Sequence, residues 1–211
     1  MKTKLIFILS LIITSVFAND DKYVTQMTKS IDAIYKARTP EEYQQTINAF
    51  ERIGNAEKTK WEPFYYASFG YLMQATREQD GGKKDQLLDL AAASLDKAKA
   101  LKENESEIVA LEGFIYMIRL TVDPTTRGPQ YSGMAMQSFG KAIGLNPENP
   151  RALAFMAQMQ YGTAEFFKSS TTEACATLAK SLEKFASFKT DNQLAPQWGK
   201  GMAEEMKEQC K

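Results

Sequence analysis

The residues that could do chemistry are few, because this 211-residue chain contains two cysteines and no histidine. Without imidazole, serine triads, cysteine–histidine dyads and histidine-containing zinc sites are excluded. Adjacent carboxylates such as Glu41 and Glu42 lie on predicted helices, where neighbouring side chains do not converge on one point. The Gly-Gly-Lys-Lys segment at 81–84 lacks the rest of a phosphate-binding loop and follows no predicted strand. The sequence therefore predicts no enzyme, no metal site and no cofactor.

The charge balance argues against a nucleic-acid partner. Lys plus Arg number 26 and Asp plus Glu number 26, so the formal net charge is zero. Binding to a phosphate backbone needs Lys and Arg concentrated on one face. We expect no nucleic acid among the partners.

The first 18 residues have the pattern of a secretory signal peptide. A basic start with Lys2 and Lys4 precedes the apolar run 5–13, and Val16 and Ala18 then stand at the −3 and −1 positions of a cleavage site. The apolar run is shorter than the roughly 20 residues of a transmembrane helix. We expect cleavage after Ala18, a single mature domain over 19–211 without an integral membrane segment, and a periplasmic or secreted location.

The mature sequence predicts an all-α domain. Alanine is abundant and valine is rare, a composition that favours helices over strands. Thr39 followed by Pro40 and Glu42 combines an N-cap, a first-turn proline and a capping-box glutamate. Other Gly, Pro and Asn clusters mark helix ends, and the segment 123–131, with two prolines, is expected as a stiff turn. The expected helices cover 20–38, 40–54, 60–79, 83–102, 105–121, 130–145, 149–167, 171–188 and 197–209.

A repeat of about 44 residues organises these helices. Four segments share the order small, large apolar, variable, basic, apolar, and they begin at 49, 94, 138 and 181. The helix before three of them carries a small residue at Ser68, Gly113 and Ala157, with nearly the same spacing. A period of 20 to 50 residues is typical of a solenoid. We expect about four helix pairs and a C-terminal capping helix.

The segment 106–150 resembles the tetratricopeptide-repeat (TPR) family. Its small, aromatic and proline positions match the family pattern at Gly113, Tyr116, Ala135, Phe139, Ala142 and Pro147. The family repeat is about 34 residues, so this repeat is longer; armadillo-type or Sel1-like repeats are the alternative. The C-terminal third also looks like exported TPR proteins of unassigned role. The resemblance implies an α-solenoid that binds a protein or peptide partner.

The first helices of the pairs are expected to line a concave face. Tyr65, Phe69, Phe114, Met117 and Tyr161 should make this face aromatic and apolar, which suits an amphipathic helix or an apolar peptide. The charged clamp that the family uses for a carboxylate is missing at the matching positions. The same residues would equally form ordinary core, and binding of a small molecule or glycan by the aromatic groove is the alternative function.

Two arginines and the two cysteines complete the candidate residues. Arg151 is expected at the rim of the concave face. Arg127, in the predicted stiff turn, could hold a carboxylate or phosphate, or could instead cap helix carbonyls or pair with a neighbouring acid. Cys175 lies near the start of the eighth predicted helix and Cys210 at the end of the ninth, so antiparallel packing would bring them level. We predict a disulfide between them.

Overall fold

The computed structural model describes residues 21–210, so the predicted signal peptide lies outside the described residues. These residues form helices and no strands. The first helix covers 21–36. It is followed by α2 (Pro40–Glu57), α3 (Glu62–Arg77), α4 (Gly81–Leu101), α5 (Ser106–Leu120), α6 (Pro124–Leu145), α7 (Pro150–Phe166), α8 (Thr172–Ser187), α9 (Lys200–Lys207) and the short 3₁₀ helix η1 (Glu208–Cys210).

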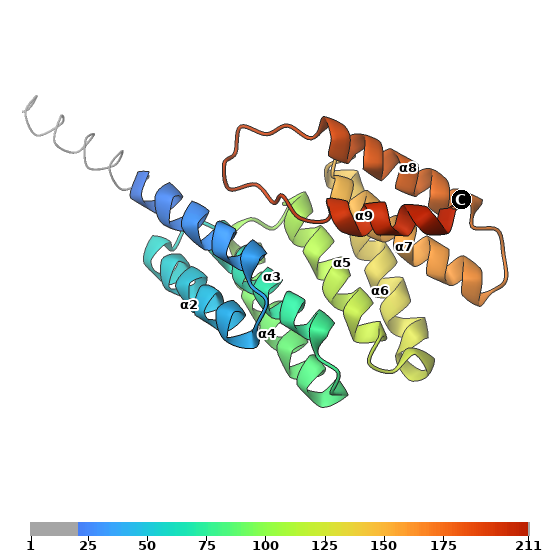
Figure 1. The fold of residues 1–211 in the computed structure, drawn as a ribbon, viewed down its shortest axis with the longest axis horizontal. Helices are drawn as coiled ribbons and strands as arrows, with labels where there is room; N and C mark the ends of the chain where they lie inside the picture. The colour runs from blue at the N-terminus through green and yellow to red at the C-terminus, as the bar shows by residue number, and fades with distance from the viewer. Residues whose placement is uncertain (1–20, 211) are drawn as a thin grey trace, which may run out of the picture.

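The helices pack as consecutive antiparallel pairs, and the pairs stack side by side (Figure 1). Helices α3, α5 and α7 begin at residues 62, 106 and 150, so each starts 44 residues after the last. They contact one another in series, α9 contacts α7, and each of the three packs against the helix that follows it. This arrangement confirms the predicted all-α solenoid and its repeat length.

Local caps explain where several helices begin. The Thr39 hydroxyl accepts a hydrogen bond from the Glu42 amide, and the Glu42 carboxylate accepts from the Thr39 amide, which is the predicted capping box. Asp80 and Asn149 likewise accept from amides in the first turns of α4 and α7. Each cap satisfies backbone donors that the helix itself leaves unpaired.

Two glycine positions show how closely the helices approach. A Cβ on Gly113 of α5 would lie 2.5 Å from the nearest ring atom of Phe139 on α6. A Cβ on Gly70 of α3 would lie 2.6 Å from the Ile47 side chain on α2. The absence of a side chain therefore allows α5 to pack against α6 and α3 to pack against α2.

The predicted turn over 123–131 is wrong, because α6 begins at Pro124 and continues through this segment. Asp123 is the N-cap and accepts a hydrogen bond from the Thr126 amide. Pro124 stands in the first turn, where a missing N–H costs nothing. Pro129 lies inside the helix and forgoes one hydrogen bond there. The helix tolerates that loss, so Arg127 lies on a helix rather than in a turn.

The segment 188–199, which we call the strap, joins α8 to α9 without forming a helix. In Figure 1 it is the long orange-to-red loop that leaves α8, reaches back toward α5 and returns to α9. Gly199 ends the strap at a φ of 100°, a left-handed conformation that glycine adopts readily. The last helix therefore begins at Lys200, three residues later than predicted.

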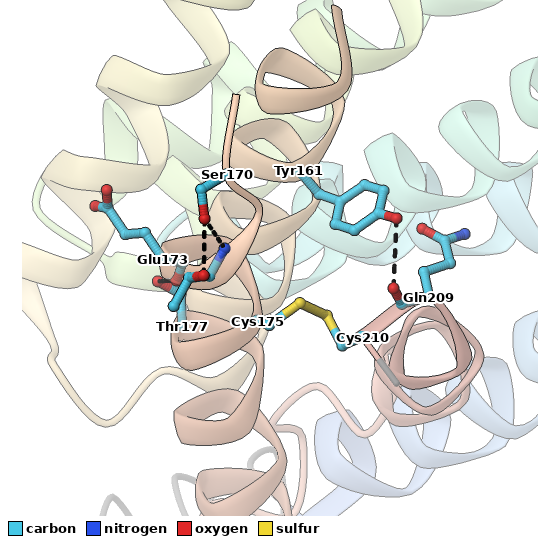
Figure 2. Close-up of a disulfide and its surroundings, with 8 residues drawn as sticks. Tyr161, Ser170, Glu173, Cys175, Thr177, Gln209 and Cys210 are labelled. Atoms are coloured by element: carbon cyan, nitrogen blue, oxygen red, sulfur yellow. Dashed lines mark hydrogen bonds between the residues drawn. A yellow bond between two sulfur atoms is a disulfide. The ribbon is translucent and has the colours of Figure 1, made fainter. Parts of the chain in front are cut away.

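A disulfide closes the C-terminal part of the chain, as predicted. Cys175 on α8 is bonded to Cys210 in η1, and their Cα atoms are 5.6 Å apart (Figure 2). Beside this bond, the Tyr161 hydroxyl of α7 donates to the Gln209 carbonyl over 3.4 Å. The bond therefore fixes the end of the chain to the start of α8.

Candidate functional site

Three of the five side chains predicted for the concave face lie together, and the strap covers them. Tyr65 and Phe69 on α3 and Phe114 on α5 are buried side chains. The Trp198 ring lies over this face, with its centroid 4.9 Å from that of Phe69 and 6.0 Å from that of Phe114. Phe155 of α7, which the sequence analysis did not select, completes the stack at 5.8 Å from Trp198. These aromatic side chains are therefore inaccessible while the strap is in place.

Tyrosine hydroxyls hold the strap backbone to the groove. The Tyr66 hydroxyl donates a 2.8 Å hydrogen bond to the Leu194 carbonyl. The Gln197 amide donates to the Tyr35 hydroxyl over 3.1 Å. Burial raises the pKa of Tyr66 and of Tyr35 above the ordinary tyrosine value, so both hydroxyls stay protonated at alkaline pH values at which an exposed tyrosine ionises.

Trp198 is held at both its side chain and its backbone. Its indole Nε1 donates to the Tyr65 hydroxyl over 3.1 Å, and its carbonyl accepts from Arg151 Nη1 over 3.3 Å. Burial raises the pKa of Tyr65 well above its ordinary value. The groove thus recognises one flat aromatic ring and the main chain on either side of it.

Arg151 is the charged centre of the groove. Its side chain is 1% exposed, and its Nε and Nη2 donate to the two carboxylate oxygens of Glu107 over 2.7 and 2.6 Å. Burial lowers the pKa of Arg151, but the hydrogen bonds and charge of Glu107 outweigh that effect and raise it overall. The guanidinium also lies over the rings of Phe185 and Phe188, 6.0 and 5.1 Å from their centroids. Arg151 therefore lies inside the structure rather than at an open rim.

The remaining predicted site residues have other surroundings. Met117 is buried in the main core cluster, which also contains Trp198, and Tyr161 packs in a second cluster beside Cys210. Arg127 forms a two-point ion pair with Asp85 of α4, at 2.7 and 2.8 Å. This pair bears out the alternative that Arg127 binds a neighbouring acid. Of the predicted site residues, four have contacts with Trp198 of the strap, namely Tyr65, Phe69, Phe114 and Arg151.

A cavity of about 450 Å³ opens where the strap meets the ends of the helices. We call it the mouth cavity. Trp61 and Phe188 contribute aromatic side chains, and Pro196 contributes a further apolar surface. Its charged lining residues are Lys102, Lys184, Lys189, Glu62, Glu105, Glu107 and Glu148. The volume lies within the usual 300–1,000 Å³ of small-molecule sites.

The cations of the mouth cavity differ in how they are paired. Lys102 is 2.8 Å from Glu105, and Lys184 is 2.9 Å from Glu148. Lys189, on the exposed part of the strap, has no ion pair within the described residues. This cavity could not be predicted from the repeat, because its lining comes from three helices (α3, α5 and α8), the turns between helices, and the strap.

A separate exposed feature lies at the turn between α7 and α8. Phe166 and Phe167 are 80% and 71% exposed, and their rings meet edge to face at 5.1 Å. Lys168 follows with a φ of 53°. Large aromatic side chains are rarely left in water this completely, so the turn offers an apolar contact surface.

Two further features bear on function. Over residues 21–210, no helix combines the length and apolar character needed to cross a bilayer. Within the same range, no three Asp, Glu or Cys side chains are grouped so that they could hold a metal ion.

The comparisons with known proteins find similar chains among solved structures. No protein-family model and no curated protein matches the sequence. Among solved structures, the HusA haemophore from Porphyromonas gingivalis is similar, with 28% identity, a TM-score of 0.80 and coverage of 90% of this chain and 92% of that one. The MamA protein matches 81% of this chain and 98% of its own with 17% identity and a TM-score of 0.32. The likeness to HusA extends over nearly the whole of both chains.

Proposed function

We propose that this protein is an exported carrier that binds haem or a closely related planar tetrapyrrole. The observation that carries the proposal is the similarity to a haemophore at a TM-score of 0.80 over 90% of the chain. Residues 1–18 would direct export, and 19–211 would form one helical-repeat domain in the periplasm or outside the cell. The role is binding and transfer rather than catalysis.

The mouth cavity is the proposed binding site. A tetrapyrrole is a flat apolar ring with carboxylates at one edge, and the cavity offers matching chemistry on its walls. Trp61 and Phe188 can cover the ring faces. Lys189, which has no carboxylate partner within the described residues, can bind a propionate.

The iron of a bound haem would have an unusual environment. The chain contains no histidine, which excludes the commonest haem ligand. The residues that line the mouth cavity also include no tyrosine, methionine or cysteine. We therefore expect haem to be held mainly by ring contacts and carboxylate pairing, with no imidazole signature in its absorption spectrum.

Titration of haemin into the purified protein tests the proposal. The Soret band should change saturably at one equivalent. Phe188→Ala should weaken binding about fivefold or more, because an aromatic contact of about 1 kcal/mol or more is lost. Phe167→Ala is the matched control, since Phe167 is an exposed aromatic outside the cavity, and it should bind haemin normally.

The possible outcomes distinguish a wrong function from a wrong location of the binding site. Absence of saturable binding to the wild-type protein would exclude the haem-carrier function. If Phe167→Ala weakens binding and Phe188→Ala does not, the haem site lies at the α7–α8 turn and the mouth cavity is excluded.

A further inference from the structure

The strap turns at 192–195, where the Ala195 amide donates to the Asn192 carbonyl, and its following residues cross the groove without forming a helix. Its buried side chains are Leu194, Pro196 and Trp198, at alternate positions, while the intervening Gln197 is exposed. Extended peptides present alternate side chains to a surface in the same way. Through Leu194 and Trp198 the strap joins the apolar cluster that contains Tyr65, Phe69 and Phe114.

Recognition of the strap depends on its main chain as much as on its side chains. Two carbonyls, of Leu194 and Trp198, accept hydrogen bonds from groove side chains, and the Gln197 amide donates one. Main-chain contacts of this kind are available to any extended peptide. The Trp198 ring, which stacks on Phe69 and binds Tyr65, adds selectivity for an aromatic residue.

Lifting the strap requires no helix to unfold. Its ends are fixed, because α8 packs on α7 and the Cys175–Cys210 disulfide ties η1 to α8. Between these ends, residues 189–193 are exposed. Local opening breaks only the contacts of the segment itself, here three buried side chains and four hydrogen bonds, and so costs less free energy than unfolding the domain. Release of the three buried side chains would thus uncover the groove while the solenoid stays folded.

We propose that the strap is an autoinhibitory occupant of the concave groove, and that an extended peptide with an apolar residue, a proline and an aromatic residue at alternate positions binds there by displacing it. The strap competes as a tethered ligand, and short tethers give effective concentrations in the millimolar range. The intact protein should therefore bind such a peptide weakly. Weakening the strap should reveal the full affinity of the groove.

Fluorescence anisotropy with a labelled peptide of the strap sequence Asp-Asn-Gln-Leu-Ala-Pro-Gln-Trp-Gly tests this proposal. The Trp198→Ala protein, which loses the main anchor of its own strap, should bind the peptide at least about tenfold more tightly than the wild type does. Gln193→Ala changes an exposed strap residue and should behave as the wild type. The same peptide with alanine in place of tryptophan should not bind.

The proposal is wrong if a Trp198→Ala protein with unchanged helical circular dichroism binds the peptide no better than the wild type. A measurement on the wild type covers the case in which this variant fails to fold. By hydrogen exchange, the Leu194 and Gln197 amides should exchange at least about 100-fold faster than the centres of α5 and α7. If the strap amides exchange only as slowly as those of α5 and α7, the strap opens together with these helices and is part of the core, and the proposal is wrong. Neither experiment depends on haem binding.

Discussion

Glu107 and Arg151 occupy the same position of consecutive repeats, 44 residues apart, and form a two-point ion pair in which Arg151 is buried and Glu107 is partly buried. Each is the second residue of its helix, α5 and α7 respectively. The pair therefore joins two repeats at equivalent points, and the same Arg151 holds the Trp198 carbonyl of the strap. One guanidinium thus connects the stacking of the repeats to the closure of the groove.

Removal of one partner from this pair should destabilise the protein strongly. Glu107→Ala leaves the Arg151 charge buried without its carboxylate, which typically costs about 3–5 kcal/mol. Urea unfolding of Glu107→Ala, Arg151→Met and the double variant measures the effect. The double variant should lose clearly less than the sum of the single losses, because it leaves no uncompensated charge. Additive losses would show that the two residues act independently.

Stability should fall at alkaline pH because of the buried tyrosines. Burial raises the pKa of Tyr35, Tyr65 and Tyr66 in the folded protein above the ordinary value of 10.0. The unfolded chain loses these protons first, so the stabilisation is complete below pH of about 10 and is lost as the pH rises toward the folded values. Absorbance at 295 nm and circular dichroism, followed together, should show these tyrosines ionising only as the helices unfold. Ionisation of all nine tyrosines with intact helices would contradict this prediction.

Loss of the disulfide should lower stability without changing the helical content. The bond between Cys175 and Cys210 spans 35 residues, and closing a loop of that length contributes about 3–4 kcal/mol in the chain-entropy model. A Cys175→Ala/Cys210→Ala variant should therefore unfold at lower urea concentration. The wild type measured with reductant provides the comparison. Equal unfolding midpoints for oxidised and reduced wild type would show that the bond contributes nothing.

Two glycine-to-alanine substitutions should have opposite effects on the free energy of unfolding. Gly113→Ala places a Cβ against the Phe139 ring, which cannot move freely in the core, and should destabilise by about 1–3 kcal/mol. Gly133→Ala lies within α6 with open space around the added Cβ, so it should stabilise by about 0.5–1 kcal/mol through helix propensity. Thermal unfolding of both variants measures whether each substitution lowers or raises stability. Two stabilising substitutions would show that α5 and α6 can adjust to the added methyl group.

Sequence analysis predicted the features that depend on local or periodic patterns. The helix boundary at Pro40 follows from a cap, and the stacking of α3, α5 and α7 follows from a 44-residue period. The Cys175–Cys210 bond follows from two antiparallel helices whose lengths bring the cysteines level. In each case neighbouring residues or a fixed spacing carry the information.

The strap and the start of α6 could not be predicted in this way. Pro129 resembles a turn signal, but the pairing of Arg127 with Asp85 fixes the first turns of α6 against α4, and that contact spans 42 residues. Trp198 was assigned to the last helix, and only long-range contacts with Tyr65 and Phe69 show its place. Tyr65, Phe69 and Phe114 of the predicted face lie together beneath Trp198, but Phe155 and the strap that covers them were not predicted. Their role in binding a partner stays a prediction.

The disulfide also determines what a single cut in the strap would do. Lys189 is exposed and lies between the two bonded cysteines, so a protease that cleaves after lysine can nick the chain there. The C-terminal piece would remain attached through Cys175 and Cys210, and the protein would gain the mass of one water instead of losing a fragment. Only reduction would then separate the two pieces, so the strap can be severed while α9 remains covalently joined to the rest of the molecule.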